Sequence, residues 1–264
     1  MLLVCFLGPK LFEGSSGVYI TVLPAGQGDS SLFEFPNGQV MLIDAGPKEE
    51  YLLSFLKRKQ ISTIDVLVLS HPDGDHIMGF FRVIEELKVK EIWHSGFDKS
   101  HFLMAKLLNL AEQRKILVKK IPELLGEHAF GDSRVWVLAP THFDSKQSTN
   151  NNSMVVKIVM GNDSALWPGD LESIRETQAL PSWKASVLKA PHHGSKSSSS
   201  EHLVKTVSPQ HVIFCTQAEN NFGFPNPIIK ERWEMAKAKT WDTGTQGKID
   251  IVLTGHGVQV SSFL

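Results

Sequence analysis

Four side chains that can bind a metal ion lie within six residues: His71, Asp73, Asp75 and His76, directly after the apolar run of residues 64–70. With independent residue usage, about one chain in a thousand of this composition would contain this pattern by chance, so coincidence explains it poorly. In an extended loop, residues two apart project to the same side, which lets His71 and Asp73 reach one cation. Imidazole and carboxylate together suit Zn²⁺ or Mn²⁺.

Further candidate ligands follow other apolar runs. Asp44 ends the run 40–43, Asp170 follows the run 165–167, and His192 and His193 follow the run 187–190. A lone Asp after a strand usually caps a turn or a helix. Several runs that all end in Asp or His indicate instead an enzyme that gathers ligands at the ends of its strands.

In their order along the chain, six motifs resemble those of one known family: residues 26–30 (GQGDS), 42–46 (LIDAG), 70–76 (SHPDGDH), 150–153 (NNNS), 168–170 (PGD) and 190–195 (APHHGS). From about Val18 to the C-terminus, the chain is similar to the metallo-β-lactamase-fold hydrolases of the competence (DNA-internalisation) type. The resemblance implies an α/β fold, an αββα sandwich in one domain over residues 1–264, with a two-metal site at one edge of the two sheets.

The resemblance also implies a role for each matching residue. His71 and Asp73 hold the first metal, whereas the second is held by Asp75, His76 and His192, and Asp170 bridges the two. Asp44 is expected to orient ligands by hydrogen bonds. The other residues expected to support the ligands are Asn152, Ser153 and Ser195.

The chain departs from the family pattern in three places. Asn150 to Ser153 stand where a histidine ligand is usual, and His142 is a possible substitute. Residues 223–227 read GFPNP where a GHPHP stretch is common, and Pro24-Ala25 replace an acidic residue. A proton donor must then come from His193, Lys196 or the Ser197–Ser200 run. The choice between His192 and His193 as the metal ligand remains open, with His192 the first expectation.

The expected ligands suggest a mechanism. Two divalent ions, Zn or Mn, lower the pKa of a bridging water, and the resulting hydroxide attacks phosphorus or carbon. Asp75 can orient that hydroxide, while His193 or Lys196 contacts a phosphate or protonates a leaving oxygen. An anionic substrate suits a carboxylate-rich metal pair, so we expect a phosphodiesterase or nuclease whose substrate is a phosphodiester, including nucleic acid or a nucleotide.

Two alternatives remain open. One is a metallohydrolase that acts on a thioester, lactone or lactam, and the other is a catalytically degenerate metal-binding subunit or sensor.

A formal charge of −1 over 264 residues gives no general attraction to nucleic acid. Two cysteines, Cys5 and Cys215, are too few for a disulfide framework, which favours the cytoplasm. The apolar residues 1–7 are shorter than the roughly 20 that span a bilayer, so we expect a first strand or packing arm there, no membrane span and a stand-alone domain.

Apolar patterning predicts the elements that must position the ligands. Helical periodicity occurs at residues 52–56, 81–87, 102–111 and 228–236, and Ser197–Ser200 reads as a helix N-terminus. Hairpins followed by βα units would form the first half, and the second half would repeat that order from Met154. Strands are expected near residues 18–23, 31–35, 40–44, 64–70, 89–94, 116–121, 135–138, 154–160, 165–167, 185–190, 211–216 and 248–253.

The sequence also predicts the backbone shape of Gly74 and the locations of several aromatic residues. Gly74 is expected to adopt a backbone shape that other residues would resist. Trp136 and three other aromatics, Phe80, Phe81 and Trp93, lie in apolar runs and are expected in the core. Loop positions make Phe97, Phe222 and Phe224 the candidates for the wall of a substrate site.

Overall fold

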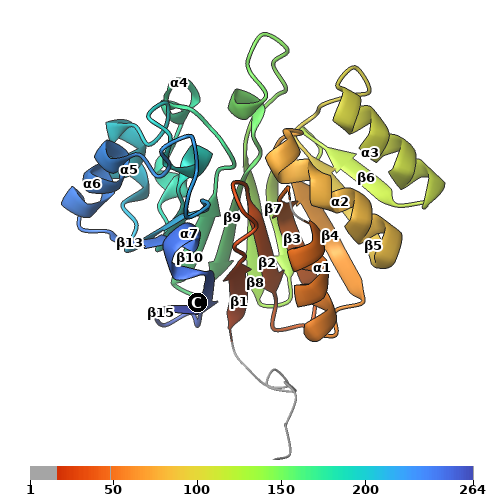
Figure 1. Ribbon diagram of the computed structural model, residues 1–264, viewed down its shortest axis with the longest axis horizontal. Helices are drawn as coiled ribbons and strands as arrows, with labels where there is room; N and C mark the ends of the chain where they lie inside the picture. Colours follow the sequence, from red (N-terminus) through yellow and green to blue (C-terminus); the bar gives the residue numbers. More distant parts are fainter. Residues whose placement is uncertain (1–16, 48, 264) are drawn as a thin grey trace, which may run out of the picture.

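The structure is a computed structural model that describes residues 17–47 and 49–263. Cys5 and the apolar segment of residues 1–7 lie outside the described residues. Two sheets lie face to face at the centre, and helices cover their outer faces (Figure 1).

The first sheet has eight strands in the order β15-β14-β1-β2-β3-β4-β5-β6. Strands β3 to β6 pair in parallel, and the remaining neighbours pair antiparallel. The strands are β1 (Val18–Val22), β2 (Ser30–Glu34), β3 (Val40–Ala45), β4 (Thr63–Leu69), β5 (Lys88–His94), β6 (Leu117–Lys120), β14 (Lys248–Leu253) and β15 (Val258–Phe263).

The second sheet has seven strands in the order β13-β12-β11-β10-β9-β8-β7. It begins with an antiparallel meander, β7 to β10, and continues with parallel strands to β13. The strands are β7 (Gly126–Phe130), β8 (Ser133–Ala139), β9 (Val155–Met160), β10 (Asp163–Trp167), β11 (Val187–Lys189), β12 (His211–Phe214) and β13 (Lys239–Asp242).

Three helices lie on the side of the first sheet: α1 (Glu49–Arg58), α2 (Gly74–Glu86) and α3 (Phe102–Gln113). Three others lie on the side of the second sheet: α4 (Ser173–Glu176), α5 (Glu201–Val207) and α6 (Pro227–Met235) (Figure 1). The short helix α7 (Thr243–Gln246) joins β13 to β14. As expected, a serine caps the N-terminus of α5: Ser200 Oγ accepts a hydrogen bond from the Leu203 N–H at 3.2 Å.

Three apolar layers hold these elements together. One lies between the sheets and includes Phe33 and Trp167, whose rings meet edge to face at 5.0 Å. A second layer packs α1 to α3 on the first sheet through residues such as Phe80, and a third packs α5 and α6 on the second sheet through residues such as Trp233. This arrangement confirms the αββα sandwich.

The sequence patterns located the twelve expected strands, but three more exist. Strands β7, β13 and β15 are short or half-exposed edge strands whose apolar signal is weak. The second half therefore starts its hairpins at Gly126 rather than Met154. Phe80, Phe81 and Trp93 are buried as expected, whereas Trp136 is 36% exposed on β8. Phe97, expected in the wall of a substrate site, is instead buried in the core beneath the helices of the first sheet.

The topology explains where the functional residues meet. Strands β3 and β4 are parallel neighbours, as are β10 and β11. Because parallel strands end at the same edge of a sheet, the segments that follow them lie together. Asp44, His71, Asp170 and His193 are thereby brought to one edge of the sandwich.

Candidate metal centre

Four side chains form a compact cluster that can hold a metal ion: the half-buried Asp75 and the buried His76, Asp170 and His193, with one ligand atom from each lying within 4.8 Å of the others. Asp170 Oδ2 lies 3.3 Å from His76 Nε2 and 3.1 Å from His193 Nε2. Asp75 Oδ2 lies 3.3 Å from His193 Nε2. Two carboxylates and two imidazoles thus converge from α2 and from the ends of β10 and β11.

The imidazole nitrogens in this region test whether a metal fits. The Nε2 atoms of His71, His76 and His193 are buried, and none makes a hydrogen bond of acceptable geometry with any described residue. A buried polar atom without a partner costs roughly 1–3 kcal/mol. Three such nitrogen atoms beside carboxylates form a donor set that suits a divalent transition metal such as Zn²⁺ or Mn²⁺. The residues of this region therefore fit a bound metal ion.

Asp44 fixes the tautomers of the first two imidazoles. Its Oδ2 accepts a hydrogen bond from His76 Nδ1 at 2.9 Å and another from Ser70 Oγ at 2.6 Å. Since the Ser70 hydroxyl donates to Asp44, its oxygen accepts from His71 Nδ1 at 3.0 Å. Both rings therefore carry their proton on Nδ1 and leave the Nε2 lone pair for a metal.

His193 is oriented by the second sheet. Its Nδ1 lies 2.9 Å from the carbonyl oxygen of Cys215, which can only accept, so Nδ1 donates and Nε2 is left for a ligand. The backbone here is strained, because His192 and His193 have φ of 50° and 53°, and non-glycine residues in that region cost about 1–3 kcal/mol. The turn at Pro191–Gly194 keeps this conformation and directs the His193 ring inward.

His71 and Asp73 lie beside the four-residue cluster. The His71 ring is 4.1 Å from the His76 ring between centroids, and His71 Nε2 is 3.6 Å from Asp73 Oδ2. Asp73 is the more exposed partner, and its Oδ2 accepts a hydrogen bond from Thr149 Oγ1 at 3.1 Å. This pair is available for a second ion at the outer side of the cluster.

Sequence patterns missed a buried lysine. Lys189 is fully buried at the end of β11, where Nζ forms an ion pair with Asp29 and lies 3.1 Å from Asp170 Oδ1. Its Nζ also donates to the Gly169 carbonyl oxygen at 3.0 Å. A lysine inside an apolar strand was the signal that could have identified it, and the GQGD motif was the signal for Asp29.

The charges of these groups depend on one another. Although burial disfavours the charged imidazoles, Asp170 raises the pKa of His76 and of His193 well above the usual range. Burial likewise opposes ionisation of Asp170, but His193 and Lys189 hold the pKa of its carboxyl well below the usual range. Burial and the neighbouring His76 lower the pKa of His71 to about 4. The site therefore keeps Asp170 negative.

His192, the expected ligand, is not brought into the cluster. Its side chain is 22% exposed, with Nδ1 3.2 Å from Ser197 Oγ and 3.7 Å from Glu172 Oε1. The structure thus places His192 at the rim of the site and His193 inside it. Consecutive histidines in a strained turn point to different sides, which the sequence order alone does not reveal.

The other expected site residues support loops or face solvent. Asn152 binds the loop before it, since its Nδ2 donates to the carbonyl oxygens of Asp144 and Ser148. Ser153 Oγ accepts from the backbone N–H of Asp170 at 3.1 Å, so it fixes the backbone that carries the cluster carboxylate. Ser195 contacts Ser197, whereas Lys196 and His142 are exposed.

Helix α2 presses closely on β3 to place Asp75 and His76. A Cβ added to Gly79 would lie 2.2 Å from the Ala45 carbonyl oxygen. Gly74 was wrongly expected to need an unusual backbone: it is the first residue of α2, and its added Cβ would lie no closer than 3.9 Å to Met78. Glycine is therefore required at position 79, where the helix meets the strand.

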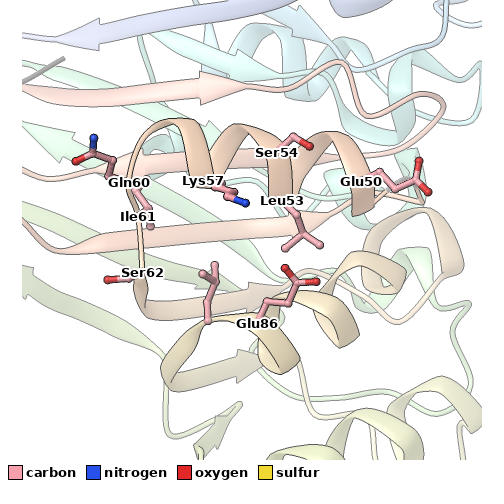
Figure 2. Close-up of a pocket in the computed structure, with 9 residues that line it drawn as sticks. Glu50, Leu53, Ser54, Lys57, Gln60, Ile61, Ser62 and Glu86 are labelled. Atoms are coloured by element: carbon pink, nitrogen blue, oxygen red, sulfur yellow. The ribbon is translucent and has the colours of Figure 1, made fainter. Parts of the chain in front are cut away.

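A surface hollow of about 610 Å³ lies between α1, which lines it from Glu50 to Lys57, and the C-terminal end of α2 (Figure 2). Its lining includes Leu53, Lys57 and Glu86, and no histidine or cysteine. The cluster is at the opposite end of α2, a helix of 13 residues that spans about 20 Å. The hollow is therefore separate from the metal-binding cluster.

Within residues 17–47 and 49–263, no helix is long and apolar enough to cross a membrane.

Two proteins of known sequence are similar to this chain. The chain is 28% identical to ComE operon protein 3 of Bacillus subtilis (strain 168) over 94% of its length and 34% of that protein. It is 25% identical to Recombination protein 2 of Haemophilus influenzae over 88% of its length and 28% of that protein. The chain thus spans about a third of these relatives.

A solved structure shows the same fold. CmlA, a diiron β-hydroxylase from Streptomyces venezuelae, superposes with a TM-score of 0.59 at 12% identity, over 95% of this chain and 55% of CmlA. The family model of the metallo-beta-lactamase superfamily matches residues 23–217, which include the whole four-residue cluster. The chain therefore belongs to the metallo-beta-lactamase superfamily.

Proposed function

We propose that this chain hydrolyses phosphodiesters at a divalent metal centre held by Asp75, His76, Asp170 and His193. The observation that carries the proposal is the convergence of two buried, unpaired Nε2 atoms on the Asp170 carboxylate. Superfamily membership supports a metal-dependent hydrolase in general. The proposed ligand set exchanges the roles expected for His192 and His193.

The charge of the site supports two ions. A histidine must be neutral to bind a metal through Nε2. With the imidazoles in that form, five carboxylates against the one ammonium of Lys189 leave a formal charge of −4, which two divalent cations would balance. We propose that His71 and Asp73 hold the second ion, with Zn or Mn as the metal. The five carboxylates are those of Asp29, Asp44, Asp73, Asp75 and Asp170.

The residues at the rim have distinct roles in this proposal. When bound, the metal supplies Lewis acidity that lowers the pKa of water and neutralises developing charge. Burial opposes ionisation of Asp75, but the His193 imidazole lowers the pKa of its carboxyl. Because this carboxylate is ionised and 35% exposed, it can orient the attacking water. His192 and Lys196, on the turn beside it, contact the phosphate or the leaving oxygen.

The relatives and the charge of the chain together narrow the substrate. One of the two relatives is named for recombination, which supports a phosphodiester derived from nucleic acid. Nonspecific DNA affinity, however, comes largely from cationic contacts with phosphate, and the chain has a formal charge of −1. We therefore favour a small phosphodiester or nucleotide over duplex DNA.

Elemental analysis followed by an assay tests the proposal. Protein purified without added metal should carry one to two equivalents of Zn, Mn or Fe, and Asp170→Ala should lose most of it, whereas the exposed Asp132→Ala should not. Metal-loaded protein should cleave bis-p-nitrophenyl phosphate, whose leaving group needs little protonation, and should cleave plasmid DNA slowly.

Each alternative predicts a different result. Rapid, salt-sensitive DNA digestion that disappears in Asp75→Ala would make the chain a nuclease. Turnover of a lactam, lactone or thioester without turnover of any phosphodiester would assign it to the carbon-centred hydrolases. Bound metal without turnover of any of these substrates would support a degenerate metal-binding subunit.

A further inference from the structure

Two phenylalanines follow one another outward from the histidine His193 of the metal-binding cluster. The rings of Phe224 and His193 lie 6.3 Å apart between centroids at an interplanar angle of 25°. Phe222 lies 5.7 Å from Phe224 at 20°. The three rings thus form a nearly parallel series that begins at a buried candidate ligand and ends at Phe222, which is 68% exposed.

The loop that carries these rings is fixed by polar contacts. The Phe224 N–H donates to Asn220 Oδ1 at 2.9 Å, and Asn220 Nδ2 donates to the carbonyl oxygens of Phe224 and Gln217 at 2.7 and 2.8 Å. The Asn226 N–H donates to the Gly194 carbonyl oxygen at 3.0 Å, which ties the loop to the turn of His193. Backbone contacts, rather than burial of the rings, therefore hold the phenylalanines beside the site.

His192 also lies beside the ring series. Its ring lies 5.9 Å from Phe224 at an angle of 67°, edge to face. Phe222 is the exposed end of the series. An exposed phenylalanine alone has no special meaning, but here it continues a stack that begins at a candidate metal ligand.

We propose that Phe222 and Phe224 form a stacking platform, which binds a flat ring of the substrate while its phosphate lies at the metal centre. The inference rests on the proposed function and specifies its substrate class: a phosphodiester with a nucleobase or an aryl group. Stacking of a base on an aromatic side chain contributes about 1–3 kcal/mol by alanine substitution and tolerates any base. Phenylalanine offers no hydrogen-bonding group, so the platform does not distinguish one base from another.

Binding of small phosphates to metal-loaded protein tests the platform. Calorimetry with thymidine 5′-monophosphate should give an affinity that falls roughly 5- to 100-fold in Phe222→Ala. Affinity for ribose 5-phosphate and inorganic phosphate should not change. The matched control is Phe102→Ala, because Phe102 is 80% exposed on α3, outside the loop of the platform. Phenyl phosphate as a fourth probe distinguishes an aryl site, if it alone depends on Phe222, from a nucleobase site.

Phe224→Ala is a second variant that separates stacking from folding. Its metal content is measured first, because Phe224 also lies against the candidate ligand His193. At unchanged metal content, selective loss of the ring-bearing ligands supports the platform. Equal loss of all four ligands, or no loss in either variant, would overturn it.

The test also separates this inference from the proposed function. Cleavage of bis-p-nitrophenyl phosphate with the same KM in wild type and Phe222→Ala, together with unchanged nucleotide affinity, would reject the platform and leave the phosphodiesterase. Ring-dependent binding without any turnover of phosphodiesters would keep the platform and reject the phosphodiesterase.

Discussion

His193 donates from Nδ1 to the carbonyl oxygen of Cys215 at 2.9 Å, so an imidazole from the end of β11 is oriented by the end of β12. The bond leaves His193 Nε2 facing Asp170 and Asp75. His192, one residue earlier, has no such anchor and lies at the rim. The two adjacent histidines therefore differ in what each can do.

We expect His193→Ala to lose at least half of the bound metal and His192→Ala to retain it. His193 provides a buried ligand atom, whereas His192 contacts Ser197 and Glu172. Elemental analysis after gel filtration measures the metal. If His192 protonates the leaving oxygen, turnover of a phosphodiester with an alkyl leaving group should fall 10²- to 10⁴-fold in His192→Ala, whereas turnover of an aryl phosphodiester, whose leaving group needs little protonation, should fall much less. Metal loss confined to His192→Ala would restore the roles expected from the sequence.

Asp44→Asn should weaken metal binding 10- to 100-fold, the usual effect of removing a group that orients a ligand. The amide keeps the volume but places an N–H₂ where Asp44 accepts from Ser70 and His76. Competition with a chromophoric zinc chelator gives the affinity. Asp65→Asn is the matched control, since Asp65 is also buried near a strand of the first sheet but contacts Val40 and Lys90. Equal affinities in the two variants would contradict the role of Asp44.

Lys189→Met should lower the free energy of unfolding of metal-free protein by about 3–5 kcal/mol, because it leaves buried carboxylates without their cation. Lys189 is fully buried between Asp29 and Asp170. Urea denaturation measures the change, and the exposed Lys205→Met should remain within 0.5 kcal/mol of wild type. Adding Asp29→Asn to Lys189→Met should recover part of the lost free energy of unfolding. If the effects of the two substitutions simply add, Lys189 and Asp29 are not coupled.

Gly79→Ala should destabilise the protein by about 1–3 kcal/mol, the usual cost of overpacking, and should also weaken metal binding. Its Cβ would lie 2.2 Å from the Ala45 carbonyl oxygen, so α2 must move away with Asp75 and His76. Thermal unfolding with and without zinc measures both effects. Gly74→Ala is the control on the same helix, because its Cβ would make only an ordinary contact with Met78 at 3.9 Å, and it should leave stability unchanged or slightly higher.

His94 should make stability depend on pH between about 4 and 6.5. Burial, with a smaller contribution from Lys120, lowers the pKa of His94 from 6.5 to about 4. The unfolded chain therefore takes up the proton more readily, so this contribution is complete above pH 6.5 and is lost as the pH falls towards 4. Relative to His94→Asn, wild type should lose about 3 kcal/mol over that window.

Urea denaturation of both proteins in EDTA measures the difference without metal release. Asparagine can still accept from the Gly96 N–H, as His94 Nδ1 does at 3.2 Å. Parallel stability curves for the two proteins from pH 7 to 4 would show that His94 is not responsible.

Part of the candidate site was predictable because its signal is local. The motif of residues 71–76 combines metal-binding side chains within one loop, and Asp44 and Asp170 each follow an apolar strand. Parallel strands of a sheet end at a common edge, so the meeting of these residues follows from the pattern. The αββα sandwich follows similarly from hairpins and βα units that occur twice along the chain.

The sequence by itself predicted the sandwich, the two imidazoles and two carboxylates of the loop at residues 71–76, and Asp170. It could do so because apolar periodicity and the spacing of candidate ligands are short-range properties. Only the tertiary structure decided that His193 rather than His192 enters the cluster, since a left-handed backbone and the Cys215 carbonyl aim that ring. It also decided the positions of Lys189 and Asp29, which lie 160 residues apart in the sequence and meet as a buried ion pair. Such contacts depend on how two sheets face each other, and no local pattern records that.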